Sequence, residues 1–202
     1  MIKAIGFDYG GVIWGEPGSK FISELSKILG VSVEQLNKAY FSFNVLLNTD
    51  KLSVEEFWKS VLTKLERQEM LPELMEFTNK KKEVKINVDV LNLVDFLKAK
   101  GYKVGLLSNL SSKLAVDLRK VGIDKHFDVT LISTEIGFVK PEKAAFELLA
   151  QKLGVAMNEM LFIDDTEQSL SSSKELGFCP ILFTNYDKLR SDLGHILNLT
   201  TL

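Results

Sequence analysis

The chain has 202 residues, of which 46% are hydrophobic and 26% charged, enough to bury one ordinary core and a small second unit. Its formal charge of −2 excludes the basic excess that binding to nucleic acid or an anionic membrane requires, so we expect a small-molecule partner. Cys179 is the only cysteine, which excludes an intrachain disulfide and fits a reducing compartment. The N-terminal apolar stretch is too short to cross a bilayer and carries no cleavage signal. These features predict a cytoplasmic protein, either a monomer or a homodimer.

Short apolar runs alternate with helical patterns over most of the chain, which is typical of βαβ units and a parallel sheet. Five candidate strands are nearly continuously apolar, as expected of strands covered on both faces: residues 2–8, 103–108, 129–133, 160–164 and 180–184. Four helical patterns each end at a glycine: residues 89–100, 112–121, 142–153 and 167–176. The sequence therefore predicts an α/β fold with a five-stranded parallel sheet and helices on both of its faces.

Residues 15–84 break this alternation, because they show helical periodicity and helix caps but no strand-like run. Ser32 and Ser53 each begin a capping box, and Pro72 suits the first turn of a further helix. The segment 80–83 is most simply a solvated linker that returns to the core. We therefore predict an all-helical insertion at 15–84 in a core made of residues 1–14 and 85–202.

Polar residues follow four of the candidate strands, where ligands of open parallel sheets gather. They are Asp8, Ser108 with Asn109, Lys140, and Asp164 with Asp165. Each one alone has an ordinary explanation as a turn residue or a helix cap. Together, three clustered acids repel one another unless a hard cation intervenes, and Mg²⁺ is the usual solution.

Lys140 lies directly before Pro141, which suits the first turn of the next helix. A lysine is locally unfavourable there, because the helix dipole favours anions at that end. A phosphate between the lysine and the helix would reverse the sign of this interaction. The sequence thus indicates an anion site beside Lys140.

Four segments resemble, in order, the motifs of the haloacid dehalogenase-like (HAD) superfamily: FDYGGVI, LLSN, GFVKPE and LFIDD. The helical insertion between the first two is similar to the first type of cap in this superfamily. The last two segments look most like the branch of α-glucose-1-phosphatase-like sugar phosphatases. The resemblance covers nearly the whole chain and implies a Rossmannoid core with a helical cap.

The resemblance implies a phosphatase that uses Mg²⁺ and acts on a small phosphomonoester, with a sugar phosphate favoured. Asp8 would be the nucleophile that forms an aspartyl-phosphate, and Lys140 would offset the charge at the reacting phosphate. Asp8, Asp165 and the carbonyl of Gly10 would hold the metal, with Asp164 in support. The phosphoryl oxygens would be bound by four residues: Ser108, Asn109, Gly10 and Gly11.

The chain departs from the family at Gly10, where an aspartate usually serves as general acid and then base. General acid–base catalysis typically contributes about 10²–10⁴-fold, so three outcomes stay open. The protein could be a slow phosphatase, a phosphatase for undemanding leaving groups, or a protein that binds metal and phosphate without turnover. Asp50 and water both remain as proton donors. A 2-haloacid dehalogenase is less favoured, because two further carboxylates beside the nucleophile would repel a carboxylate substrate.

Several residues of the insertion could contact the substrate. Asn48 and Asp50 lie in a predicted loop between helices, a place where this fold often reads its substrate. The other candidates to line a pocket are Trp14, Phe41, Phe43 and Asn44. Aromatic residues at such spacing more often form the core of the insertion itself.

Overall fold

The computed structural model describes residues 1–80 and 86–199, and its centre is a parallel sheet with the strand order β3-β2-β1-β4-β5. The strands are β1 (Ala4–Phe7), β2 (Lys103–Ser108), β3 (Val129–Ile132), β4 (Met160–Asp164) and β5 (Cys179–Leu182). Every neighbouring pair is parallel. The predicted α/β fold with five parallel strands is confirmed.

Alternate side chains of each strand point to opposite faces of the sheet, and these side chains are apolar on both faces. Helices therefore cover both faces. Phe7, Leu106 and Ile163 face one cluster, which includes residues of α5 (Val88–Ala99), α6 (Ser112–Lys120) and α11 (Tyr186–Leu197). On the other face, Leu107 and Phe162 pack against α8 (Lys143–Leu153). The remaining helices of this part are short: α7 (Ser133–Ile136), α9 (Glu167–Leu170) and α10 (Ser173–Leu176).

Two details of the predicted helices were wrong. The pattern at 167–176 forms two short helices, α9 and α10, and between them the hydroxyl of Ser171 donates to the carbonyl of Gln168 (2.8 Å). Pro141 lies before α8 and not in its first turn, since the helix begins at Lys143. Residues 139–142 instead form a turn that the N–H of Glu142 closes on the carbonyl of Val139 (2.8 Å). Lys140 therefore does not lie against the first turn of a helix, and the helix dipole does not act on it as predicted. Carboxylates balance its charge instead.

Four helices form a separate unit, which we call the cap: α1 (Gly18–Leu29), α2 (Val33–Leu47), α3 (Val54–Leu65) and α4 (Leu71–Lys80). Both capping boxes are present, at Ser32 and at Ser53, and Pro72 lies in the first turn of α4. The cap has its own hydrophobic cluster around Leu36, Phe57 and other residues of all four helices. Residues 81–85, and with them most of the predicted linker and the boundary at 84, lie outside the described residues, as do residues 200–202.

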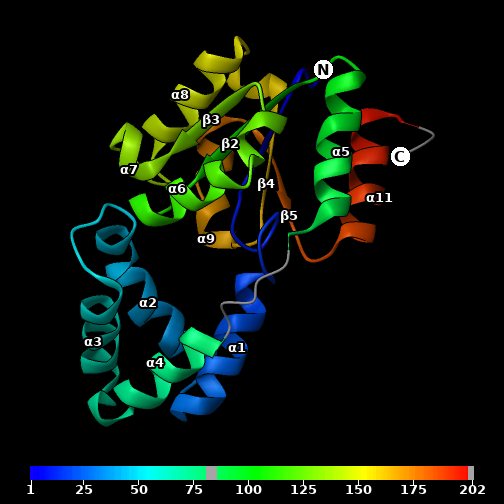
Figure 1. Cartoon of the computed structure of the whole chain (residues 1–202). Coiled ribbons are helices and arrows are strands. Elements are labelled where there is room, and N and C mark those ends of the chain that lie inside the picture. The colour runs from blue at the N-terminus through cyan, green and yellow to red at the C-terminus, as the bar shows by residue number, and fades with distance from the viewer. Residues whose placement is uncertain (81–85, 200–202) are drawn as a thin grey trace.

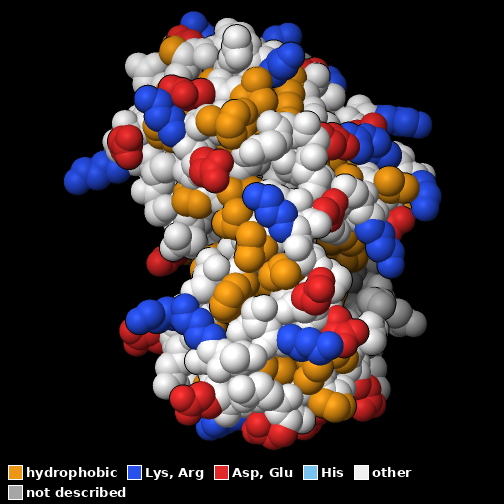
Figure 2. All heavy atoms as spheres, turned by 90° about the vertical axis from the view of Figure 1, so that its left-hand side faces the viewer, with side chains coloured by type: hydrophobic (Ala, Val, Ile, Leu, Met, Phe, Trp, Pro, Cys, Tyr) orange, Lys and Arg blue, Asp and Glu red, His pale blue; other side chains and the backbone are white. Residues whose placement is uncertain are grey.

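The cap lies beyond the edge of the sheet at which the strands end, as Figure 1 shows. The chain leaves the core near Trp14 and re-enters it near Ile86, and these two residues form an isolated antiparallel bridge. Hydrophobic side chains gather where the core and the cap meet on the side shown in Figure 2. Among the described residues, no helix has both the length and the apolar character that a membrane span requires. The arrangement encloses the carboxyl ends of the strands between the two units.

Candidate active site

Two acidic residues meet at the carboxyl edge because of the register of the central strands. Phe7 of β1 pairs with Ile163 of β4, and the N–H of Asp8 donates to the carbonyl of Ile163 (2.8 Å). Asp8 and Asp164, which follow these paired residues, therefore leave the sheet side by side. Both are buried, with exposed fractions of 8% and 0%. Two buried carboxylates next to each other require compensating positive charge.

Lys140 supplies this charge from the turn before α8. Its Nζ lies 2.8 Å from Oδ1 of Asp8 and 2.5 Å from Oδ2 of Asp164, and it stands above the ring of Phe162 (5.1 Å). Burial alone would lower the pKa of Lys140, but attraction to Asp164 and Asp8 outweighs it and raises the pKa above its usual value. Burial raises the pKa of Asp8, with Lys140 and Ser108 opposing this shift. Because Lys140 holds its proton, we treat Asp8 as the carboxylate of an ion pair.

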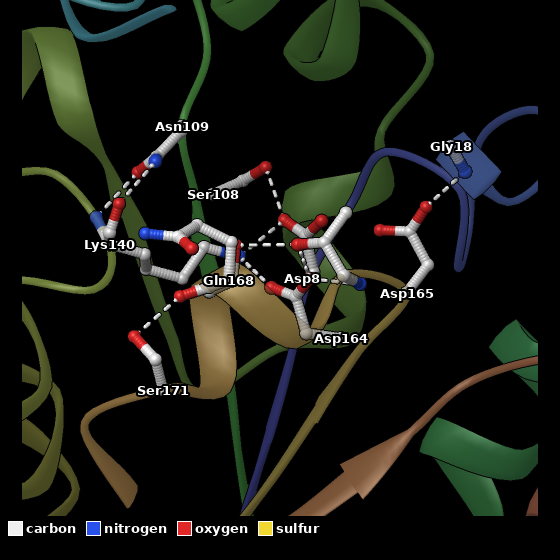
Figure 3. Close-up of polar contacts among 11 residues, drawn as sticks. Asp8, Gly18, Ser108, Asn109, Lys140, Asp164, Asp165, Gln168 and Ser171 are labelled. Carbon is white, nitrogen blue, oxygen red and sulfur yellow. Dashed lines mark hydrogen bonds and ion pairs between the residues drawn. The ribbon is translucent and has the colours of Figure 1, made fainter. Parts of the chain in front are cut away.

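Ser108 and Asn109, at the end of β2, have different positions relative to Asp8. The hydroxyl of Ser108 donates to Oδ1 of Asp8 (2.7 Å). The side-chain amide of Asn109 bonds instead to the main chain of Lys140, with Nδ2 donating to its carbonyl (3.0 Å) and Oδ1 accepting from its N–H (2.8 Å). Asn109 therefore fixes the turn that carries the lysine, and its main-chain N–H and the second N–H of its side-chain amide remain for a phosphoryl oxygen. Figure 3 shows Asn109 and Lys140 on one side of Asp8.

Thr166 contributes to the site although the sequence analysis did not select it. Its N–H (2.9 Å) and hydroxyl (2.7 Å) both donate to Oδ1 of Asp164, whose other oxygen contacts Lys140. A threonine two residues after an aspartate is a common local hydrogen-bonding pattern, so the sequence did contain a signal. Asp164 is thus fully engaged, which makes it a support for Lys140 more than a free ligand.

Asp165 lies on the opposite side of Asp8 from Lys140, toward the cap (Figure 3). Its Oδ2 accepts from the main-chain N–H of Gly18, the first residue of α1. A Cβ at Gly11 would come within 2.1 Å of this oxygen, and Gly11 has φ +71°, so only glycine fits there. Burial and repulsion from Asp8 and Asp164 raise the pKa of Asp165 to about 7. Gly18 is 147 positions from Asp165, and no local pattern in the sequence links the two.

Gly10 differs from Gly11, since a Cβ built on it meets nothing within 4 Å and its φ is not in the left-handed region. An L-amino acid side chain could therefore be accommodated at this position. The space around this position, two residues after the nucleophile, is open. The absence of an acid here is not forced by packing.

The donor set fits a hard divalent cation. One carboxylate oxygen from each of Asp8, Asp164 and Asp165 lies within 4.8 Å of the others. With Lys140 protonated, three carboxylates and one ammonium give a local charge of −2, which a divalent cation would neutralise. The raised pKa of Asp165 has the same origin, because the third carboxylate has no cation of its own. Oxygen ligands of this kind are those that Mg²⁺ prefers.

The remaining candidates lie in the cap or beside it. Trp14 stacks on Tyr9 (5.8 Å between ring centroids) and packs against the core cluster, and Phe43 packs in the cap cluster. Phe41 contacts the ring of Tyr40, and Asn44 is half-buried. The oxygens of Asp50 accept from the N–H and hydroxyl of Ser112 at the start of α6, and the carbonyl of Asn48 accepts from Ser133 (2.7 Å).

Comparisons with known proteins agree with the fold and identify similar phosphatases. The chain is 29% identical to a D-ribitol-5-phosphate phosphatase of Bacteroides thetaiotaomicron, with 98% of this chain and 100% of that protein covered. It is 26% identical to a phosphatase of Mycobacterium tuberculosis, with 98% and 97% covered. A HAD family enzyme of Bacteroides thetaiotaomicron, solved as a magnesium complex, shares the fold with a TM-score of 0.62 at 22% identity, covering 95% of this chain and 98% of that one.

The family itself is shown by a match that spans nearly the whole chain. The family model of the haloacid dehalogenase-like hydrolases matches residues 2–187, which include all four motif segments and the cap. The predicted superfamily is therefore confirmed, while its sugar-phosphatase branch stays a prediction. The chain belongs to the haloacid dehalogenase-like hydrolases.

Proposed function

We propose that this protein is a Mg²⁺-dependent phosphatase that hydrolyses a small phosphomonoester through an aspartyl-phosphate on Asp8. Its general class, a phosphoric monoester hydrolase, agrees with the phosphatases among its relatives. The observation that carries the finer proposal is the environment of Asp8. Ser108 and Lys140 both contact its Oδ1, and among residues 1–80 and 86–199 no side chain donates a hydrogen bond to Oδ2. One oxygen is held in place and the other is left to attack.

In the first step, Oδ2 of Asp8 attacks phosphorus, the new O–P bond forms, and the bond from phosphorus to the leaving alkoxide breaks. Lys140 stays beside Asp8 and offsets the negative charge of the carboxylate and the phosphoryl group. Ser108 holds the reacting carboxylate in its orientation. In the second step, water attacks phosphorus, phosphate leaves, and the carboxylate of Asp8 is restored.

Asp8, Asp165 and the carbonyl of Gly10 would hold Mg²⁺, with Asp164 in support. When bound, the ion would reduce the repulsion between the anionic nucleophile and the anionic substrate. Asn109 and the main chain of Gly10 and Gly11 would bind phosphoryl oxygens. Ser108, which orients Asp8 in the free protein, would join them by turning its hydroxyl to the phosphoryl group once substrate is bound. The side chain of Asn109 would act on Lys140 by holding its main chain.

A sugar or polyol phosphate is the substrate class that we favour. One relative aligned over nearly its whole length is named a D-ribitol-5-phosphate phosphatase, and the space beside Gly10 leaves the site without the usual acid. An anomeric hydroxyl needs less protonation as it leaves, because it is more acidic than an ordinary alcohol. Water in the open space at Gly10 would supply the proton to other leaving groups.

The specific alternative is a protein that binds metal and phosphate with little or no turnover, and Gly10 is the feature that favours it. A 2-haloacid dehalogenase ranks lower, since Asp164 and Asp165 bring the local charge to −2 beside a substrate that is itself a carboxylate. We keep the cytoplasm as the predicted location and either a monomer or a homodimer as the assembly.

The test is release of inorganic phosphate from a panel of sugar phosphates, polyol phosphates and para-nitrophenyl phosphate, with Mg²⁺ or with a chelator. We expect turnover that needs Mg²⁺ and that Asp8→Asn lowers by at least about 10³-fold. Phosphate and Mg²⁺ binding without turnover would favour the binding protein. Metal-independent turnover of 2-haloacids would favour the dehalogenase, and either result would overturn the proposal.

A further inference from the structure

The loop between α2 and α3 of the cap reaches the core at the segment that follows β2. In this cap loop, residues 48–53, the carboxylate of Asp50 accepts from the N–H of Ser112 (3.1 and 3.3 Å to its two oxygens) and also from its hydroxyl. The hydroxyl of Ser133, which is fully buried, donates to the carbonyl of Asn48 (2.7 Å). Two residues of the cap loop therefore bond to two residues of the core.

The contact with Asp50 gives the N-terminus of helix α6 a side-chain cap from outside the helix. Ser111, its N-cap residue, makes no side-chain capping bond, although serine is among the preferred residues at this position. The carboxylate of Asp50, from the other unit, accepts instead from the first N–H of the helix, that of Ser112, where the positive end of the helix dipole also favours an anion. Asp50 has φ 55°, a left-handed conformation that aspartate tolerates better than most residues.

The core residues that the cap loop touches lie next to those that contact the nucleophile. Ser108 donates to Asp8, and Ser112 follows only four residues later. Between them, the N–H of Leu110 donates to the same Ser133 hydroxyl that binds Asn48 (3.1 Å). The segment 108–112 is thus attached to Asp8 at one end and to the cap loop at the other.

We infer that Asp50 is a positioning residue: by capping α6 from the cap, it couples the docking of the cap to the placement of the phosphate-binding segment 108–112. This inference rests on the proposed function, because Asp50 would position Ser108 and Asn109 as residues that bind the phosphate of the substrate. Substrate binding would then be tight only when the cap loop is docked. In this role both oxygens of Asp50 are directed to Ser112.

Two variants break the contact from opposite sides. Asp50→Ala removes the carboxylate. Ser112→Pro removes both the N–H and the hydroxyl, yet proline is favoured at the first position of a helix, and Ser111 before it already has a compatible backbone (φ −66°, ψ 155°). Asp50→Asn keeps a good capping group. Lys51→Ala is the matched control, an exposed neighbour in the same loop.

We expect Asp50→Ala and Ser112→Pro to raise KM for para-nitrophenyl phosphate by about tenfold, the factor that corresponds to one lost capping bond. Both variants should also speed amide hydrogen exchange in segment 109–111. Asp50→Asn should keep KM and the exchange rate close to those of the wild type, and Lys51→Ala should change neither. If Asp50 only stabilised α6, Ser112→Pro would behave like the wild type, and that result would overturn the inference. Unchanged exchange and KM in both variants would do the same.

Hydrogen exchange separates this inference from the proposed function. If the wild type shows no phosphatase activity, the proposed function fails, but the exchange of segment 109–111 still reports whether the contact with Asp50 holds that segment. If activity is present and exchange is unaffected by either variant, the inference fails and the proposed function stands.

Discussion

The two sides of Asp8 are built differently. On the buried side, Lys140, Asp164 and Ser108 are linked by contacts of 2.5–2.8 Å, and each of them is at most 4% exposed. On the side toward the cap, Asp165 is a third carboxylate with a raised pKa of about 7, and Gly10, in the loop after β1, has open space around it. The buried side holds the nucleophile with its charge balanced. The other side has a negative charge that a metal ion would balance and an open space that the leaving group would occupy.

The largest expected effect comes from the buried side. Lys140→Met leaves Asp8 and Asp164 without their counter-charge, so kcat/KM for para-nitrophenyl phosphate should fall by about 10³-fold. Loss of one partner from a buried ion pair should also lower the free energy of unfolding by about 3–5 kcal/mol at neutral pH. Steady-state kinetics and urea unfolding measure both.

Lys143→Met is the matched control, because this exposed lysine pairs with Glu147 at the surface (3.4 Å) and lies outside the site. Exposed pairs of this kind contribute little, so activity and stability should stay close to those of the wild type. A Lys140→Met protein that kept a tenth or more of the wild-type kcat/KM would contradict the assigned role of the lysine.

A smaller effect, and a gain, is expected on the side toward the cap. Gly10→Asp places an acid in the space beside Asp8, where a Cβ meets nothing within 4 Å. Turnover of an alkyl phosphate with a poor leaving group should rise by about 10²-fold, while para-nitrophenyl phosphate, which needs no proton, should change little. Parallel rate measurements on the two substrates test this difference.

Gly10→Asn has nearly the same shape as Gly10→Asp but cannot donate a carboxylic proton. We therefore expect no gain from it on either substrate. An equal gain from Asn would show that the added side chain acts by filling space, and no gain from Asp would place the proton donor elsewhere.

The same division explains how much could be predicted from the sequence. The five strands, and the polar residues at their ends, follow from local patterns, and register then brings Asp8 beside Asp164. The contacts between units could not be predicted in this way. Asp165 with Gly18 and Asp50 with Ser112 join residues 147 and 62 positions apart, and nothing in local spacing pairs them.

Lys140 and Asn109 illustrate an intermediate case. The sequence placed both at the carboxyl edge of the sheet, with the lysine beside an anion at the start of a helix and near the nucleophile, and the asparagine among the residues that bind phosphate. In the structure the lysine meets two carboxylates, and the side chain of Asn109 meets the main chain of Lys140. Patterns identify which residues reach a site, whereas tertiary packing decides which atoms they face.

The smallest expected effect concerns pH and again separates the two sides. Asp165 has a pKa of about 7 in the metal-free protein, against an ordinary value of 3.8, so between these values the folded state holds a proton that the unfolded chain has released. Stability must then fall as pH rises through this range. We expect the Tm with chelator to drop by about 5 °C between pH 5 and pH 8.

Added Mg²⁺ should raise the Tm more at pH 8 than at pH 5, because the ion binds the ionised carboxylates and competes with protons for them. Asp165→Asn should flatten the decline seen with chelator and reduce the effect of Mg²⁺, since the amide neither titrates nor carries charge. Thermal unfolding of both proteins at each pH is the measurement. A Tm with chelator that is constant or rises from pH 5 to pH 8 would mean that burial and repulsion from Asp8 and Asp164 do not raise the pKa of Asp165. This third carboxylate would then have to be stabilised by the cap through Gly18, and not by a cation.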